Sequence, residues 1–151
     1  MTHRRFSAFL LAAALFLLGA VSTAHARDMV SVARGEVNMR SAPGTRSEVQ
    51  WALSRGYPLQ VLSRRGGWLQ VRDFENDRGW VLRSLTARTP HHVVKAPVAN
   101  LRATPSTRGR LVGKATRGEV LRTIERKGAW VKVRHANGRT GWVASRLVWG
   151  W

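Results

Sequence analysis

The chain has 151 residues, of which 26 are lysine or arginine and only 8 are aspartate or glutamate, so its formal charge is +18 at pH 7. It contains no cysteine, which excludes disulfide bonds and a thiol nucleophile. Such a charge fits attraction to an anionic partner, and it equally fits a bias in base composition combined with solubility; composition leaves both open.

The first 26 residues predict a helical signal peptide for export. Arg4 and Arg5 form a positive segment, residues 9–20 are an apolar run, and residues 24–26 place small side chains where a signal peptidase reads them. Since the apolar run is shorter than the ~20 residues that span a bilayer, cleavage near Arg27 is favoured over a retained membrane anchor. We therefore expect an exported protein, periplasmic or secreted, with no stable membrane span after cleavage.

The rest of the chain contains one unit twice. Residues 36–46 return as residues 98–108, at an offset of 62 positions. The same offset pairs Trp68 with Trp130, and no gap is needed between Asn38 and Leu85. One supersecondary unit is therefore used twice, with expected domains at residues 27–88 and 89–151.

The first unit predicts short strands separated by turns. A strand within residues 30–39 ends where Pro43 and Gly44 demand a turn, and Arg40, like Arg102 in the second unit, is expected to brace the long loop that follows. Further strands are expected at residues 49–53, 59–61, 68–72 and 79–82. Short strands at this spacing, without helical periodicity, predict a small barrel.

The segment joining the two units, residues 86–92, is too short to keep them independent, so we expect the second barrel to lie against the first. The histidine pair within it fits a linker better than a metal site, since neighbouring side chains on an extended chain point to opposite sides. In the second unit, Asn137-Gly138 predicts a type I′ hairpin turn, with positive φ at both residues. Trp149 and Trp151 have no counterparts in the first unit and are expected to cover an apolar seam.

Both units carry the same ordered motifs: Asn-x-Arg-x-x-Pro, then Arg-Gly, then Gly-x-Trp-x-x-Val-Arg, then Gly-Trp-Val before a closing leucine. Over residues 32–85 and 94–148, this pattern resembles the bacterial Src-homology-3-like (SH3b) family. Ser106, in place of a glycine, and Glu119, in place of Tyr57, are departures in the second copy. The resemblance implies an all-β tandem of small SH3-like barrels with five to six short strands each. It also implies an envelope module that binds cell-wall peptides or protein segments, without catalysis.

The search for chemistry favours a binding protein over an enzyme. Asp73, Glu75 and Asp77 crowd one hairpin tip and fit a solvated turn better than a pair of catalytic carboxylates. We expect no catalytic residue, metal or cofactor. The favoured partner is a cell-wall polymer, peptidoglycan or its peptides; the alternative is an adaptor that docks on an envelope protein. Nucleic acid is disfavoured, because an exported chain meets little of it.

Three aromatic residues are private to the first copy: Trp51, Tyr57 and Phe74 stand opposite Gly113, Glu119 and Ala136. Residues that a barrel needs to fold should occur in both copies, so these differences are candidates for ligand contact. We predict an aromatic binding face on the first barrel, with Arg46 at its rim. Trp51 filling the seam between the barrels is the alternative. The shared Trp68 and Trp80 are weaker candidates, because a scaffold role is favoured for them.

The charge is concentrated in the second unit, which holds 13 basic and 2 acidic residues and so carries +11. Contact with an anionic polymer is therefore expected there, and its candidates are Arg108, Arg110, Arg117, Arg122, Arg126, Lys127 and Arg139.

Overall fold

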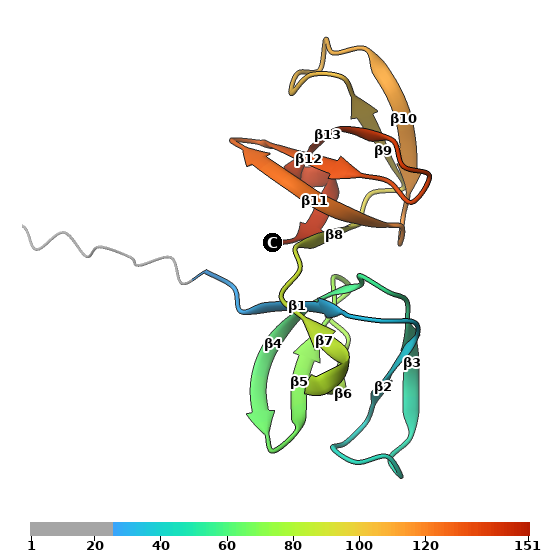
Figure 1. Cartoon of the computed structure of the whole chain (residues 1–151), viewed down its shortest axis with the longest axis vertical. Coiled ribbons are helices and arrows are strands. Elements are labelled where there is room, and N and C mark those ends of the chain that lie inside the picture. The colour runs from blue at the N-terminus through green and yellow to red at the C-terminus, as the bar shows by residue number, and fades with distance from the viewer. Residues whose placement is uncertain (1–25) are drawn as a thin grey trace, which may run out of the picture.

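The structure, a computed structural model, describes residues 26–151, which form two seven-stranded antiparallel sheets in succession along the chain (Figure 1). The first sheet contains β1 (Met29–Val32), β2 (Val37–Arg40), β3 (Val49–Leu53), β4 (Pro58–Arg65), β5 (Trp68–Arg72), β6 (Arg78–Leu82) and β7 (Thr86–Ala87). The second contains β8 (His91–Val94), β9 (Val98–Arg102), β10 (Leu111–Thr116), β11 (Val120–Lys127), β12 (Trp130–Arg134), β13 (Thr140–Ala144) and β14 (Val148–Gly150). The predicted all-β tandem of barrels is confirmed.

The predicted signal peptide lies outside the described residues, apart from Ala26. From residue 26 onward, the helical segments are short 3-10 turns, η1 (Arg83–Leu85) and η2 (Ser145–Leu147). No helix in this part of the chain is long and apolar enough to cross a membrane.

Each sheet has seven strands rather than the five or six expected. The strand predicted within residues 30–39 is divided into β1 and β2, because Gly35 turns the chain with a φ of 52°. At the other end of the unit, the two-residue strand β7 pairs with β1, an addition too short to leave a sequence pattern.

The repeat in sequence is a repeat in topology. The strand order is β3-β2-β6-β5-β4-β1-β7 in one sheet and β10-β9-β13-β12-β11-β8-β14 in the other, so each strand has a counterpart. Even an irregularity recurs: β4 and β11 each bulge at matched positions, after Val61 and after Thr123. The bulges bend the long strands and help each small sheet to close.

Each barrel has its own apolar core, made by alternating residues of its strands. In β5, Leu69 and Val71 are buried while their neighbours face outward, and Val131 and Val133 do the same in β12. The predicted brace is confirmed too. Arg40 Nη1 donates to the Ser47 carbonyl at 2.8 Å, and Arg102 Nη1 donates to the Gly109 carbonyl at 3.0 Å.

The predicted type I′ turn at Asn137-Gly138 is wrong. Gly138 has a φ of 86°, but Asn137 does not have a positive φ. The connection between β12 and β13 runs over residues 135–139, so it is longer than a two-residue hairpin, and the Gly138 amide donates to the His135 carbonyl at 2.9 Å. A turn of this length needs a positive φ at only one residue, the one at the position of Gly138. In the first barrel, Asn76 occupies the equivalent position and has a φ of 70°.

The two barrels pack against each other, as expected from the short linker. A Cβ atom added at Gly56, in the turn before β4, would lie 2.8 Å from His91 Cδ2 and 3.1 Å from Val120 Cγ1. Nearby, the Arg117 guanidinium of the second barrel lies 3.7 Å from the Glu75 carboxylate of the first. The seam between the barrels therefore brings side chains from both units together.

Candidate ligand-binding site

An open pocket of about 390 Å³ lies at this seam and collects the three aromatic side chains that are private to the first barrel. We call it the aromatic cleft. It is lined by Trp51, Ala52, Leu53, Tyr57, Asp73, Phe74, Glu75 and Asp77 from the first barrel, and by Arg117 and Gly118 from the second.

The fold holds each aromatic residue of the cleft in a different way. Trp51 lies on the edge strand β3 and is 53% exposed, which does not suit a residue that fills a closed interface. Tyr57 follows the turn at Gly56, and its amide donates to the Ser54 carbonyl at 3.1 Å. Its ring packs against the core and lies 6.5 Å from the ring of Phe74, with an angle of 46° between the planes. This tilted geometry is favourable for an aromatic pair.

The acidic hairpin tip is an ordered wall of the cleft. Asp73 is 7% exposed, and its Oδ1 accepts hydrogen bonds from the amides of Glu75 and Asp77, both at 2.9 Å. Burial raises the pKa of Asp73, although these hydrogen bonds oppose the shift. Burial also raises the pKa of Tyr57, with a smaller contribution from the three nearby carboxylates, so its phenol stays protonated and can donate a hydrogen bond.

Arg117 completes the cleft from the second barrel. Its guanidinium lies 5.1 Å from the centre of the Phe74 ring, and it also donates to the Lys95 carbonyl. A cation over an aromatic face is held by the ring quadrupole, and the same guanidinium is paired with the Glu75 carboxylate at the exposed edge of the cleft. The cleft therefore combines apolar walls, three carboxylates and one guanidinium, an arrangement that suits a ligand carrying both ammonium and carboxylate groups.

Other predicted ligand contacts lie elsewhere. Arg46 is on the exposed loop between β2 and β3 and does not line the cleft. Trp68 and Trp80 project from the outer face of the neighbouring strands β5 and β6, and the Arg65 guanidinium lies 5.4 Å from the Trp80 ring. These residues do not join Trp51, Tyr57 and Phe74 in one site.

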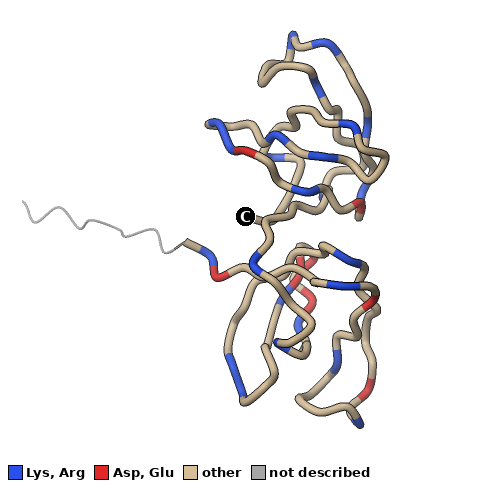
Figure 2. The backbone as a smooth tube through the Cα atoms, viewed as in Figure 1, with Lys and Arg blue, Asp and Glu red and all other residues tan. Residues whose placement is uncertain are grey.

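The seven cations proposed for polymer contact are all exposed, and lysine and arginine dominate the second barrel (Figure 2). They are spread over the loop between β9 and β10, strand β11 and the hairpin after β12, whereas Arg117 alone lines the aromatic cleft. Sequence reasoning placed Arg117 among these surface charges. It did not predict that Arg117 lines the aromatic cleft, because the sequence does not show which turn of one barrel faces the other barrel.

The equivalent surface of the second barrel lacks the aromatic side chains of the cleft. Glu119 replaces Tyr57 there, and its Oε1 lies 3.2 Å from His135 Nε2, where His135 takes the place of Asp73. Ala136 removes the second ring. The two copies therefore share a scaffold and differ at this position.

Comparison with known proteins decides the family. Residues 33–87 and residues 97–148 each match a family described as "Bacterial SH3 domain". The chain belongs to the bacterial SH3 domain family. Its two domains stand in tandem and together account for more than two thirds of the sequence, as the repeated motifs indicated.

The tandem is similar to parts of longer proteins. It is 25% identical over 138 residues to YrvJ of Bacillus subtilis (strain 168), provisionally named an N-acetylmuramoyl-L-alanine amidase; the match covers 84% of this chain and 26% of YrvJ. The chain therefore spans about a quarter of that relative.

Among solved structures, an NlpC/P60 family protein from Bacillus cereus ATCC 10987 matches with a TM-score of 0.38 and 13% identity, over 80% of this chain and 55% of that one. The CBD of endolysin LysPBC5 matches with a TM-score of 0.33 and 18% identity, over 85% and 96%.

Proposed function

We propose that the tandem is an exported, non-catalytic binding module for peptidoglycan, and that the aromatic cleft takes its peptide. The observation that carries the proposal is the set of side chains in the cleft. Aromatic residues dominate recognition because they desolvate large areas at modest entropic cost. The name of the relative YrvJ refers to the junction of muramic acid and alanine, which is the sugar–peptide junction of peptidoglycan.

The charges of the cleft match the chemistry of a wall peptide. Such a peptide carries free carboxylates, which Arg117 can bind through a charge-assisted hydrogen bond. It also carries ammonium groups, which suit Glu75 and Asp77, while Trp51 and Phe74 offer apolar faces to its aliphatic side chains. The basic face of the second barrel adds long-range attraction to an anionic wall.

A catalytic role is not part of the proposal. Asp73 is the buried carboxylate of the cleft, and its Oδ1 already accepts hydrogen bonds from two backbone amides that shape the turn. The sequence supplies no cysteine nucleophile. Export is proposed from the predicted signal at residues 1–26.

Co-sedimentation of the purified chain with insoluble peptidoglycan tests this function. We expect the chain to pellet with the wall, and Trp51→Ala to remain in the supernatant. Trp80→Ala is the matched control, since it removes an indole from the outer face of the same barrel. Binding should also weaken as salt is raised, because exposed charges are screened over ~8 Å at physiological ionic strength. Wild-type protein that stays in the supernatant, but crosslinks to one envelope protein in cells, would replace this function with the adaptor role.

A further inference from the structure

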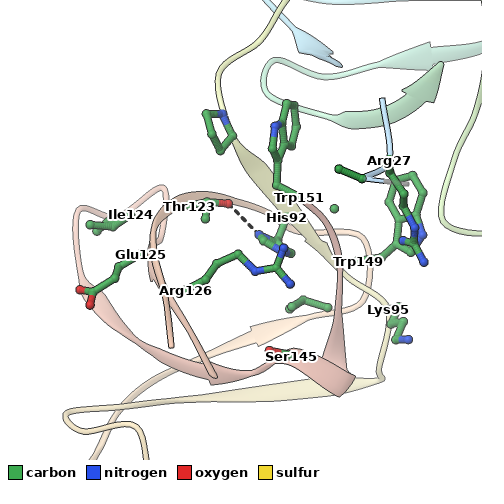
Figure 3. A pocket seen from close by; sticks show the side chains of 14 residues that line it. Arg27, His92, Lys95, Thr123, Ile124, Glu125, Arg126, Ser145, Trp149 and Trp151 are labelled. Carbon is green, nitrogen blue, oxygen red and sulfur yellow. Dashed lines mark hydrogen bonds between the residues drawn. The ribbon is translucent and has the colours of Figure 1, made fainter. Parts of the chain in front are cut away.

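We propose that the second barrel carries a separate site for an acidic sugar of a glycan strand, built around Trp149 and Trp151. The site is an open pocket of about 650 Å³ and shares no lining residue with the aromatic cleft. Figure 3 shows it from close by, with both tryptophans, Arg27, Lys95 and Arg126 along its wall.

Two tryptophans contribute aromatic surface to the wall of this pocket. Trp149 lies in β14, and Trp151 follows directly after that strand. Gly150 between them lets the segment lie flat on β8, because a Cβ there would approach the His91 carbonyl oxygen to 2.3 Å. Both indoles remain partly exposed and line an open pocket, on a strand that also contacts β4 of the first barrel.

The tryptophans of this pocket have no aromatic counterparts in the first barrel. At the offset of the repeat, Trp149 stands opposite Ala87 and Trp151 opposite Thr89. The closing strand β7 of the first barrel therefore has no aromatic residue where β14 has one. A difference of this kind between two copies of one scaffold points to ligand contact rather than to folding.

The charge of the pocket favours an anion. Arg27, Lys95 and Arg126 outnumber the one side-chain carboxylate of the lining, that of Glu125. The Arg27 guanidinium lies 5.9 Å from the Trp149 ring, and Figure 3 shows the two side chains against each other. Within residues 26–151, the charged ends of Lys95 and Arg126 have no ion-pair partner within 4.0 Å. These cations are available to a carboxylate.

The remaining wall is suited to hydroxyl groups. The Ser145 hydroxyl is buried and makes no hydrogen bond to the described part of the chain. Glu125 offers acceptor oxygens to sugar hydroxyls, and its charge opposes a run of phosphates. Indole faces carry negative potential and receive the C–H face of a sugar ring. A ring with hydroxyl groups and one carboxylate therefore fits the pocket better than a nucleic acid strand.

The test is a titration of the full chain, followed by tryptophan fluorescence, with peptidoglycan glycan strands from which an amidase has removed the peptides. Amide hydrolysis leaves a free carboxylate on every second sugar of these strands. We expect saturable binding, weakened at least tenfold by Trp149→Ala with Trp151→Ala. Arg126→Gln, an exposed change, should weaken binding and its salt dependence without unfolding the barrel. Trp68→Ala, outside both pockets, should bind as the wild type.

Three other probes separate the sources of binding. Neutral N-acetylglucosamine oligomers offer the ring without the charge, polyglutamate offers the charge without the ring, and a single-stranded oligonucleotide offers bases and phosphates. We expect all three to bind at least tenfold more weakly than the glycan strands. Equal binding of any of them, or glycan binding unchanged in the tryptophan double variant, would overturn the site. The glycan probe carries no peptide. A negative result with it therefore does not bear on peptide binding in the aromatic cleft, and a negative result for the cleft does not bear on glycan binding at this pocket.

Discussion

Replacing Trp51 and Phe74 together by alanine is expected to abolish retention of the chain on peptidoglycan while lowering its melting temperature by only a few degrees. Central aromatic contacts of a binding site cost roughly 2 kcal/mol or more when truncated, about thirtyfold in Kd for each such contact. Stability should change little from the loss of Trp51, because 53% of its surface is exposed. The measurement is co-sedimentation combined with thermal unfolding of the same samples.

Tyr57→Phe accompanies this pair, because Tyr57 packs against the core and its truncation would confuse binding with folding. It keeps the ring and removes only the phenol donor. If Trp51 instead filled the interface between the barrels, the double variant would lose ~3 kcal/mol or more of stability, as buried tryptophans do. A destabilised variant that still binds the wall would refute the cleft as the site.

Acidification from pH 7 to pH 4 is expected to destabilise the second barrel by about 3 kcal/mol through His92. Burial, reinforced by the charge of Arg126, lowers the pKa of His92 from 6.5 to about 4. The side chain is 3% exposed, and its Nδ1 lies 2.7 Å from Thr123 Oγ1. The folded state therefore holds a neutral imidazole where the unfolded chain takes up a proton.

The sign follows from this difference. Above the unfolded pKa of 6.5, His92 is neutral in both states and folding stability is at its full value. As pH falls from 6.5 toward 4, stability is lost progressively, since only the unfolded state binds the proton in that window. Burial also lowers the pKa of His91, which acts in the same direction. Asp73 acts in the opposite direction in the first barrel, because its raised pKa means that acid relieves the cost of its burial.

Urea unfolding at several pH values measures the effect. His92→Asn, which keeps a polar group near Thr123, should be less stable at pH 7 and should show a flatter dependence on pH. A variant with the same loss between pH 7 and pH 4 as the wild type would assign the effect to another group.

The fold was predictable because the same pattern of strands and turns occurs twice in the sequence. Strands appear at residues 49–53 and 68–72, as predicted. The misjudged elements were local, and one of them, the two-residue strand β7, was too short to leave a sequence pattern. Gly35 divides the first strand, and the loop at Asn137 is longer than the hairpin that its dipeptide favours. In both cases the length of a connection, which propensity does not report, decided the backbone conformation.

The candidate site was predictable only in part. Comparing the copies selected Trp51, Tyr57 and Phe74, because a residue absent from one copy is not needed by the scaffold. Arg117 could not be assigned to them, since its place depends on how one barrel turns against the other. The pocket around Trp149 depends likewise on Arg27, which is far away in sequence and reaches the indole only in the folded chain.

The most direct test of the central claim is a nuclear magnetic resonance titration of the isotope-labelled chain with soluble disaccharide-peptide fragments of peptidoglycan. We expect saturable shifts of the Trp51 indole signal and of the amides of Phe74, Glu75 and Arg117, while signals from the matched surface of the second barrel at Glu119 and Ala136 stay in place. Shifts that leave Trp51 and Phe74 unmoved, or no shifts at millimolar fragment, would contradict it.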